Sequence, residues 1–137
     1  MRYLIDTNVF IQMIKDTDLI TENVKYIIDD YENQIFVSSE SIKEFIHLVQ
    51  IGKISGKKQN FELNVFDFIE NSLGFSVKYI SKEHSQTFSN LATVEGHNDP
   101  SDRLIISQAL TEKLTLVSSD RKFPKYRKFG LNFIPNY

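Results

Sequence analysis

Residues 3–9, which read YLIDTNV, decide the fold class of this chain. The run Tyr3–Ile5 is uniformly hydrophobic, stops at a polar Asp-Thr-Asn triplet, and is followed by a second apolar run from Val9. A short continuous apolar run of this kind is typical of a strand buried on both faces of a parallel sheet. Open α/β sheets bind ligands just outside the carboxyl ends of their strands, so Asp6 is a candidate metal ligand or catalytic base.

The same pattern returns near the other end of the chain, where Thr115–Val117 leads through two serines to Asp120. Since both acids follow strands, Asp6 and Asp120 should lie on one edge of the sheet. A third run, Ile35–Val37, leads through two serines into a helical pattern that carries Glu44 about one turn in. The three acids are therefore expected at the same edge.

Predicted strands alternate with predicted helices along the chain. Runs rich in β-branched and aromatic residues predict strands at Tyr3–Ile5, Ile35–Val37, Ser76–Ile80, Thr115–Val117 and Leu131–Ile134. Hydrophobic residues at helical spacing predict helices over residues 9–14, 23–31, 41–51, 61–73, 81–91 and 104–114. Residues 52–60 read as a surface connection. This order predicts an α/β fold with a central parallel sheet of four to five short strands and helices on both faces, in three α/β/α layers.

The length and composition describe one globular domain over residues 1–137. Hydrophobic residues make up 41% and charged residues 25% of the chain, as in typical soluble domains. No apolar stretch approaches the roughly 18 residues of a membrane span, and Asp6 interrupts the first apolar run too early for a signal peptide. The absence of cysteine excludes disulfides, thiolate metal sites and a cysteine nucleophile, and it fits a cytoplasmic protein. No membrane partner is expected.

The net charge of −2 hides an asymmetry between two parts of the chain. Residues 111–137 carry six Lys and Arg against two Asp and Glu, whereas residues 1–110 carry ten against sixteen. The basic excess directly follows Asp120 and consists of Arg121, Lys122, Lys125, Arg127 and Lys128. Basic groups beside an acidic site suit a polyanionic substrate held over a metal. A solvated charged loop is the alternative.

A further acidic segment, residues 99–102 (DPSD), has the form of a helix start. Asp99 suits the N-cap, Pro100 the first helical position and Asp102 the third. Because this helix precedes the strand at 115–117, we expect it to start at the edge of the sheet opposite to the other acids. Asp102 would then reach them only if the preceding loop, residues 96–100, provides an extended entry.

Several carboxylates close together repel one another, so at least one would be protonated unless a cation neutralises them. A hard ion, Mg²⁺ or Mn²⁺, is expected because it takes a few carboxylates and keeps waters that leave room for a phosphate. Zn²⁺ is less suitable, since cysteine is absent and His47, His84 and His97 show no ligand spacing. His97 is expected on the surface of a loop. Each acid also has a structural alternative, as a helix or turn cap or a solvent-facing helical residue.

Four segments carry a resemblance to a known family. They read YLIDTNVFI (3–11), VSSESIKEF (37–45), HNDPSDRLIISQAL (97–110) and LTLVSSDRKF (114–123). In this order they resemble the PIN-domain ribonucleases, and within them the VapC-type toxins of bacterial toxin–antitoxin pairs. The third segment is similar to the H-x-D-P-x-D-R segment of that family, which precedes an apolar helix ending in Gln-Ala. Ser101 departs from it, since many relatives carry a bulky apolar residue there, and should affect packing more than chemistry.

The resemblance implies a PIN-like fold and a role for each residue at a matching position. The catalytic set would be Asp6, Glu44, Asp102 and Asp120. Within it, Asp6, Asp102 and Asp120 would hold the metal, and Glu44 would be a ligand or the base that orients the attacking water. The supporting residues would be Asn8, Asp99 and Ser118. Glu40 competes with Glu44, but it falls in the first helical turn, where the helix dipole alone favours an acid.

The implied activity is that of an Mg²⁺- or Mn²⁺-dependent endoribonuclease that cuts single-stranded or loop RNA. The expected RNA contacts are Arg103, Arg121, Lys122 and Lys125, although Arg103 has pairing with a neighbouring carboxylate as an alternative. The resemblance further implies a cognate antitoxin protein as partner and a homodimer.

Three other functions are weighed against this one. The first is a housekeeping PIN nuclease in RNA processing that has no antitoxin. The second is a phosphatase of the haloacid-dehalogenase type, which is disfavoured because it needs a second Asp where this chain has Asn8. The third is a non-enzymatic binding module whose acids only cap helices.

Overall fold

Five parallel strands form one sheet with β1 at its centre. The structure is a computed structural model that describes residues 1–54 and 61–137. The strands are β1 (Arg2–Ile5), β2 (Gln34–Ser38), β3 (Ser76–Lys78), β4 (Thr115–Ser118) and β5 (Asn132–Pro135), in the order β3-β2-β1-β4-β5 across the sheet. Ile5 of β1 is level with Val37 of β2 and Val117 of β4. The residues that follow these three strands therefore share one edge of the sheet, called here the carboxyl edge.

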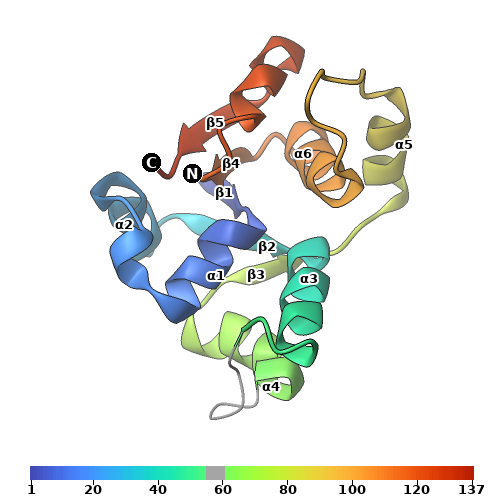
Figure 1. Ribbon diagram of the computed structural model, residues 1–137. Helices are drawn as coiled ribbons and strands as arrows, with labels where there is room; N and C mark the ends of the chain where they lie inside the picture. Colours follow the sequence, from blue (N-terminus) through green and yellow to red (C-terminus); the bar gives the residue numbers. More distant parts are fainter. Residues whose placement is uncertain (55–60) are drawn as a thin grey trace.

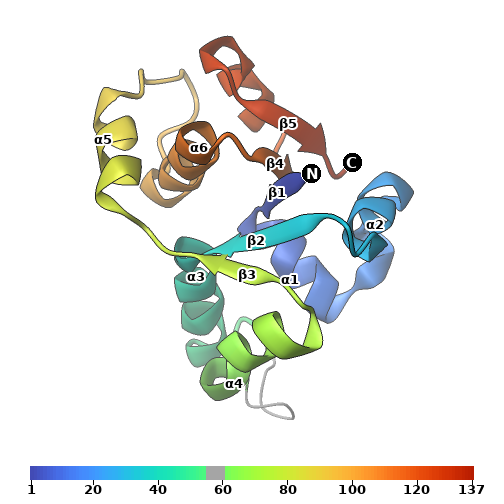
Figure 2. The same cartoon turned by 180° about the vertical axis from the view of Figure 1, so that it is seen from behind.

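Helices cover both faces of the sheet (Figure 1, Figure 2). One side holds α1 (Thr7–Lys15), α2 (Glu22–Asp29), α3 (Ser39–Gln50) and α4 (Phe61–Asp67), and the other holds α5 (Lys82–Asn90), α6 (Pro100–Glu112) and the 3-10 helix η3 (Phe123–Phe129). Side chains alternate along β1, so that Tyr3 and Ile5 enter the core under α1 and α3 while Leu4 enters the core under α6. The predicted three-layer α/β fold with a parallel sheet is confirmed.

All five predicted strands and six predicted helices are present, with shifted ends. The first helix starts two residues before the prediction, at Thr7, because Asp6 caps it. The helix predicted over residues 61–73 is α4 followed by a π-helical segment, η2 (Phe68–Ser72). Two short 3-10 helices, η1 (Thr17–Leu19) and η3, were not predicted. Residues 55–60 of the predicted surface connection lie outside the described residues.

Each helix in residues 1–54 and 61–137 is too short or too polar to cross a membrane.

Candidate metal centre

Asp6 is buried at the end of β1, with only 2% of its surface exposed. Its Oδ1 accepts a hydrogen bond from the Thr7 backbone N–H (2.7 Å), and its Oδ2 accepts one from the Ser118 hydroxyl (2.8 Å). Burial raises the pKa of Asp6 to about 7, with smaller contributions from the negative charges of Asp102 and Glu44, while the two hydrogen bonds act in the opposite direction. Asp6 is thus a helix cap and also part of an acidic cluster.

Ser118 links the ends of the two central strands. Its buried hydroxyl donates to Asp6 and accepts a hydrogen bond from the backbone N–H of Asp120 (3.0 Å). The Asp120 carboxylate in turn accepts a bond from the backbone N–H of Lys122 (2.8 Å). These contacts fix both carboxylates at the carboxyl edge, and they place Ser118 where it orients Asp6.

A buried hydroxyl pair joins α1 to α3. The Thr7 hydroxyl donates to the Ser41 hydroxyl at 2.8 Å, and the Ser38 side chain caps α3 by accepting from the Glu40 N–H. α3 therefore starts beside Asp6, and Glu44 follows one turn later. Sequence reasoning missed Thr7 and Ser41; the signal for Thr7 was a polar residue directly after an acid at a strand end.

The two acids of α3, Glu44 and Glu40, lie in different surroundings. Burial raises the pKa of the half-buried Glu44 to about 7, and the charges of Asp102, Asp99 and Glu40 add to the effect. Glu40 instead bonds to the Lys43 ammonium (2.8 Å) and the Ser101 hydroxyl (3.1 Å). Ser101, the departure noted in the third segment, thus binds Glu40.

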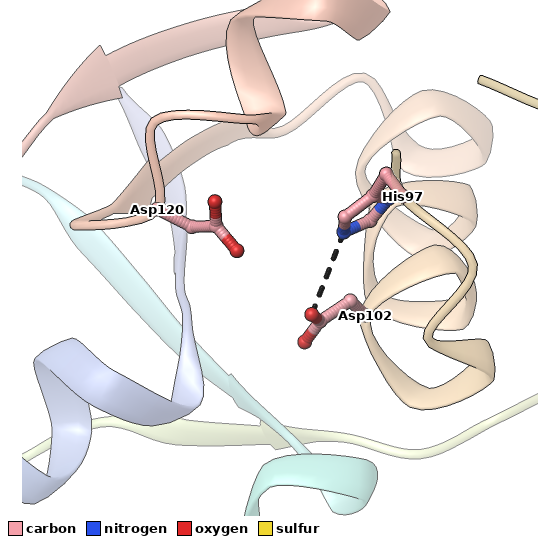
Figure 3. Close-up of side chains that lie close together, drawn as sticks. All are labelled: His97, Asp102 and Asp120. Atoms are coloured by element: carbon pink, nitrogen blue, oxygen red, sulfur yellow. Dashed lines mark ion pairs between the residues drawn. The ribbon is translucent and has the colours of Figure 1, made fainter. Parts of the chain in front are cut away.

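The expectation that α6 starts at the opposite edge of the sheet is wrong. A helix that leads into a parallel strand runs antiparallel to it, so α6 ends near the start of β4 and begins at the carboxyl edge. Asp102 in its first turn accordingly lies near Asp120 (Figure 3). No extended entry is needed. Burial raises the pKa of Asp102, as do the charges of Asp99 and Asp120, whereas His97 acts to lower it.

Of the predicted supporting residues Asp99 and Asn8, only Asp99 makes a side-chain hydrogen bond to one of the acidic residues in the described ranges. Asp99 is the N-cap of α6, where its Oδ1 accepts from the Asp102 N–H at 3.0 Å, and Pro100 is the first helical residue, as predicted. Asn8 is exposed in the first turn of α1, and no hydrogen bond joins its side chain to the acids in the described ranges.

His97 is buried, which corrects the expected position on a loop surface. Only 3% of its surface is exposed, because its ring packs edge-on against Phe123 and Tyr126. Its Nε2 points at Asp102 Oδ2 from 3.5 Å, and Asp120 lies on the far side of the same space (Figure 3). The sequence signal was its place five residues before Asp102, but its burial depends on side chains almost 30 residues away.

Arg103 does not occupy the surface position that an RNA contact requires. Its guanidinium is buried and donates to the carbonyls of Leu91 (2.9 Å) and Ala92 (3.2 Å) and to the Tyr126 hydroxyl (3.1 Å). It therefore anchors the loop before α6, which corrects both roles considered for it.

Three basic residues predicted to contact RNA are exposed after Asp120. Arg121 stacks over the Tyr137 ring at 4.1 Å, and the Lys125 ammonium donates to the Glu95 carbonyl at 3.2 Å. Lys122 is held by the turn that its backbone N–H makes with the Asp120 carboxylate. Within residues 1–54 and 61–137, none of these three cations forms an ion pair with the acids.

A hard divalent cation fits this set of donors. Asp6, Glu44 and Asp102 all have a raised pKa, so their charged forms are disfavoured in the protein alone. A cation reverses this penalty by supplying the missing positive charge. Carboxylate oxygens of Asp102 and Asp120 lie within 4.8 Å of each other, a spacing that one ion can bridge, and a ring nitrogen of His97 lies within the same distance of both.

Comparison with known proteins agrees with this geometry. Residues 3–129 match the PIN domain family. The chain belongs to this family. PIN nucleases are divalent-metal-dependent hydrolases of nucleic acids, and the acids described above fall within the matched part of this PIN domain. Among curated proteins, none matches the chain.

Solved structures of low sequence identity share the fold of this PIN domain. The VapBC2 complex from Rickettsia felis bound to a promoter DNA fragment is 22% identical, with a TM-score of 0.69 and 98% of each chain covered. FitAcB from Neisseria gonorrhoeae is 19% identical, with a TM-score of 0.70 and coverage of 99% and 98%. DNA-bound VapBC from Salmonella typhimurium is 18% identical, with a TM-score of 0.65 and coverage of 100% and 99%.

Proposed function

We propose that this PIN domain is a metal-dependent endoribonuclease that hydrolyses RNA phosphodiester bonds and is the toxin of a toxin–antitoxin pair. One observation carries the nuclease part: the carboxyl edge gathers the buried Asp6 and the half-buried Glu44 and Asp102, whose pKa values are all raised by burial and by neighbouring acids. Such a cluster costs stability in the protein alone, so a ligand of opposite charge accounts for it better than helix capping does.

The acids divide into two roles. Asp6, Asp102 and Asp120 hold Mg²⁺ or Mn²⁺, and Glu44 is a further ligand or the base that orients the attacking water. When bound, the ion supplies a water of lowered pKa and charge stabilisation for the phosphate oxygens. Ser118 keeps one Asp6 oxygen occupied by its hydroxyl and thereby directs the carboxylate. Asp99 fixes the first turn of α6 and adds negative charge, and Asn8 stands exposed beside Asp6 as a group that can bind water or substrate.

The exposed cations that follow Asp120 support a nucleic-acid substrate, and the resemblance to PIN-domain ribonucleases specifies RNA. Arg121, Lys122 and Lys125 are exposed next to Asp120 and suit a phosphate backbone. Single-stranded or loop RNA presents unstacked bases and a flexible backbone that can enter a site at the edge of a sheet.

The partner follows from what the similar structures are. Those from Rickettsia felis and Salmonella typhimurium are complexes of the VapBC type, and another similar structure is a toxin–antitoxin complex from Klebsiella pneumoniae. These complexes support a cognate antitoxin protein as the partner of this chain. The homodimeric state and the cytoplasmic location are proposed on the resemblance to VapC-type toxins alone.

Purified protein incubated with total RNA tests the proposal. Cleavage should require Mg²⁺ or Mn²⁺ and stop with a chelator. Asp6→Asn keeps an acceptor for the Thr7 N–H and places an amide donor beside the Ser118 hydroxyl, so it should fold normally and lose cleavage. The matched control is Asp18→Asn, an exposed aspartate of η1. Cleavage at the parent rate by Asp6→Asn would refute the site, and unchanged thermal stability on addition of Mn²⁺ would favour a non-enzymatic binding module.

A second experiment tests the partner. Expression of the chain alone should arrest growth, and co-expression with the small protein encoded beside it should relieve the arrest and yield a stable complex. Cleavage of RNA without such a neighbour or complex would favour a housekeeping PIN nuclease.

A further inference from the structure

The surroundings of His97 determine which of its ring nitrogens carries a proton. The ring is 3% exposed and lies between two aromatic rings, with centroid distances of 5.4 Å to Phe123 and 5.3 Å to Tyr126. Its Nδ1 is 2.7 Å from the Tyr126 hydroxyl, whereas its Nε2 makes no hydrogen bond in the described part of the chain. Nδ1 therefore has a hydrogen-bond partner in the described residues, and Nε2 has none.

The Tyr126 hydroxyl has a single hydrogen to give. It is fully buried, and its oxygen already accepts from Arg103 Nη1 at 3.1 Å. A guanidinium has donors only, so the hydroxyl hydrogen cannot be directed at Arg103. Within residues 1–54 and 61–137, the acceptor within reach of that hydrogen is His97 Nδ1. Nδ1 is then the acceptor, and the neutral imidazole carries its proton on Nε2.

The opposite arrangement leaves two buried groups unsatisfied. If His97 Nδ1 carried the proton, the Tyr126 oxygen would accept two bonds and its own hydrogen would have no partner. The Nε2 lone pair would at the same time face the Asp102 carboxylate oxygen at 3.5 Å, where two acceptors repel. The hydrogen bond from Arg103 to the Tyr126 hydroxyl, and the bond from that hydroxyl to His97 Nδ1, therefore select the tautomer with Nε2–H.

We infer that His97 is a positioning residue, whose Nε2–H holds one oxygen of Asp102 and leaves the other for the metal ion. The chain of contacts runs from Arg103 through the Tyr126 hydroxyl and the His97 ring to Asp102. In the present geometry the last contact, 3.5 Å, is longer than a hydrogen bond, so the inferred role requires the Asp102 carboxylate to turn toward Nε2–H. The inference rests on the proposed function in taking Asp102 as a metal ligand. It excludes His97 from the ligands, although its Nε2 lies near Asp102 and Asp120, because a protonated nitrogen has no lone pair to give.

The tautomer can be measured without any metal. In nitrogen-15 NMR of the metal-free protein, correlations between the ring nitrogens and carbon-bound protons distinguish Nδ1–H from Nε2–H. His97→Gln identifies the His97 signals among those of the three histidines. We expect the Nε2–H form in the parent and a mixture in Tyr126→Phe, which keeps the ring but lacks the hydroxyl. An Nδ1–H form in the parent would overturn the inference.

The metal affinity tests the positioning role. Removing a group that orients a metal ligand costs about 10- to 100-fold in affinity, so His97→Ala should weaken Mn²⁺ binding by about 10-fold in calorimetric titration. His97→Gln should recover most of the loss, because its amide N–H can replace Nε2–H, and thermal unfolding verifies that each variant is folded. Equal affinity of His97→Ala and parent would overturn the inference.

The spectrum of bound Mn²⁺ separates the two possible roles of His97. Electron spin-echo spectroscopy detects a nitrogen that coordinates Mn²⁺ directly, and we expect no such signal from the parent. A nitrogen signal that disappears in His97→Gln would make His97 a ligand and overturn the inference. If the parent binds no Mn²⁺, the proposed function fails, while the NMR arm still decides the tautomer, so the two failures are distinguishable.

Discussion

Among the described residues, two buried histidines each face a carboxylate. The His84–Glu112 pair is joined by a hydrogen bond and is called the closed pair, whereas the His97–Asp102 pair is not and is called the open pair. His84 Nε2 lies 2.8 Å from Glu112 Oε2, and its Nδ1 accepts the Ser81 N–H in the capping box of α5. His97 Nε2 stops 3.5 Å from Asp102 and makes no hydrogen bond in the described residues. The pKa of Glu112 is lowered, chiefly by the bond from His84, whereas burial raises the pKa of Asp102.

The difference lies in the charges around each carboxylate. Glu112 has the Lys78 ammonium at 3.5 Å and an Arg2 guanidinium nitrogen at 4.0 Å. Asp102 has two acids, Asp99 and Asp120, which raise its pKa. The first pair is neutralised by the protein itself and stabilises the fold. The second pair lies among further acids, an arrangement that a bound cation would stabilise, as expected of the proposed metal centre.

Replacing Asp102 and Glu112 in turn by their amides should give the largest difference in RNA cleavage between the two pairs. Asp102→Asn should reduce metal-dependent RNA cleavage by at least about 10³-fold, because it removes a proposed ligand. Glu112→Gln should leave cleavage within about twofold of the parent, because its ion pairs lie at the other end of α6. Rates are measured on one RNA at saturating Mn²⁺. Comparable losses in the two variants would show that the pairs do not differ in function.

The pH dependence of stability should also distinguish the acidic cluster. The folded protein keeps a proton on Asp6 up to about pH 7, whereas the unfolded chain releases it near 3.8. The folded state thus binds more protons between these values, and the free energy of unfolding of the metal-free protein falls as pH rises through this window. The loss due to Asp6 amounts to at most about 4 kcal/mol.

Denaturant titrations from pH 4 to 8 measure this slope. Asp6→Asn should flatten it, Mn²⁺ should restore stability to the parent above pH 7, and Asp18→Asn should behave as the parent. The Glu112 pair has the opposite sign, since a lowered pKa gives stability that is present at neutral pH and lost on acidification. A metal-free parent that becomes more stable from pH 4 to 7 would contradict the raised pKa of Asp6.

The sheet and three of the acids were predictable because the deciding information is local. The buried parts of β1 and β4 are apolar and each is followed by a polar group, so Asp6 and Asp120 could be placed on one edge without further knowledge. Glu44 followed from the position of its helix after β2. The prediction for Asp102 was wrong, because a helix that returns to a parallel strand begins at the edge where that strand ends, and not at the opposite one.

Other features depend on contacts between distant segments. The ring of His97 packs against Phe123 and Tyr126 in η3, a short 3-10 helix that was not predicted. Arg103 looks like a surface cation in sequence, and only the path of the loop at residues 91–97 supplies the carbonyls that bind it inside. Neither result can be read from spacing along the chain.

Removing His84, the histidine of the closed pair, should lower the stability of the protein and leave RNA cleavage unchanged. His84→Ala deletes a fully buried ring, its bond to Glu112 and one half of the capping box, so the free energy of unfolding should fall by about 2–4 kcal/mol. Cleavage by the folded fraction should stay within about twofold of the parent. The control is Ser85→Ala, an exposed neighbour on α5. A large loss of cleavage at a temperature where His84→Ala is folded would assign this pair a role in the site.

The smallest expected effect concerns the cations that border each carboxylate. Lys78 and Arg2 are engaged with Glu112, whereas Arg121 and Lys122 are exposed beside Asp120 with no ion pair in the described residues. Replacing Arg121 and Lys122 together with alanine should weaken RNA binding by about 3- to 10-fold. The slope of log affinity against log salt should fall by roughly 0.7 for each phosphate of single-stranded RNA that is no longer neutralised.

Fluorescence anisotropy with the catalytically inactive Asp102→Asn protein measures this binding without cleavage. The control replaces two exposed lysines outside the site, Lys15 and Lys82, so that the same net charge is removed elsewhere. An equal loss in the control would mean that RNA responds only to the overall charge of the protein. A loss confined to Arg121 and Lys122 places the RNA backbone along the rim that follows Asp120. Lys78 and Arg2 near the closed pair would then stabilise the fold, whereas Arg121 and Lys122 near the open pair would bind the substrate.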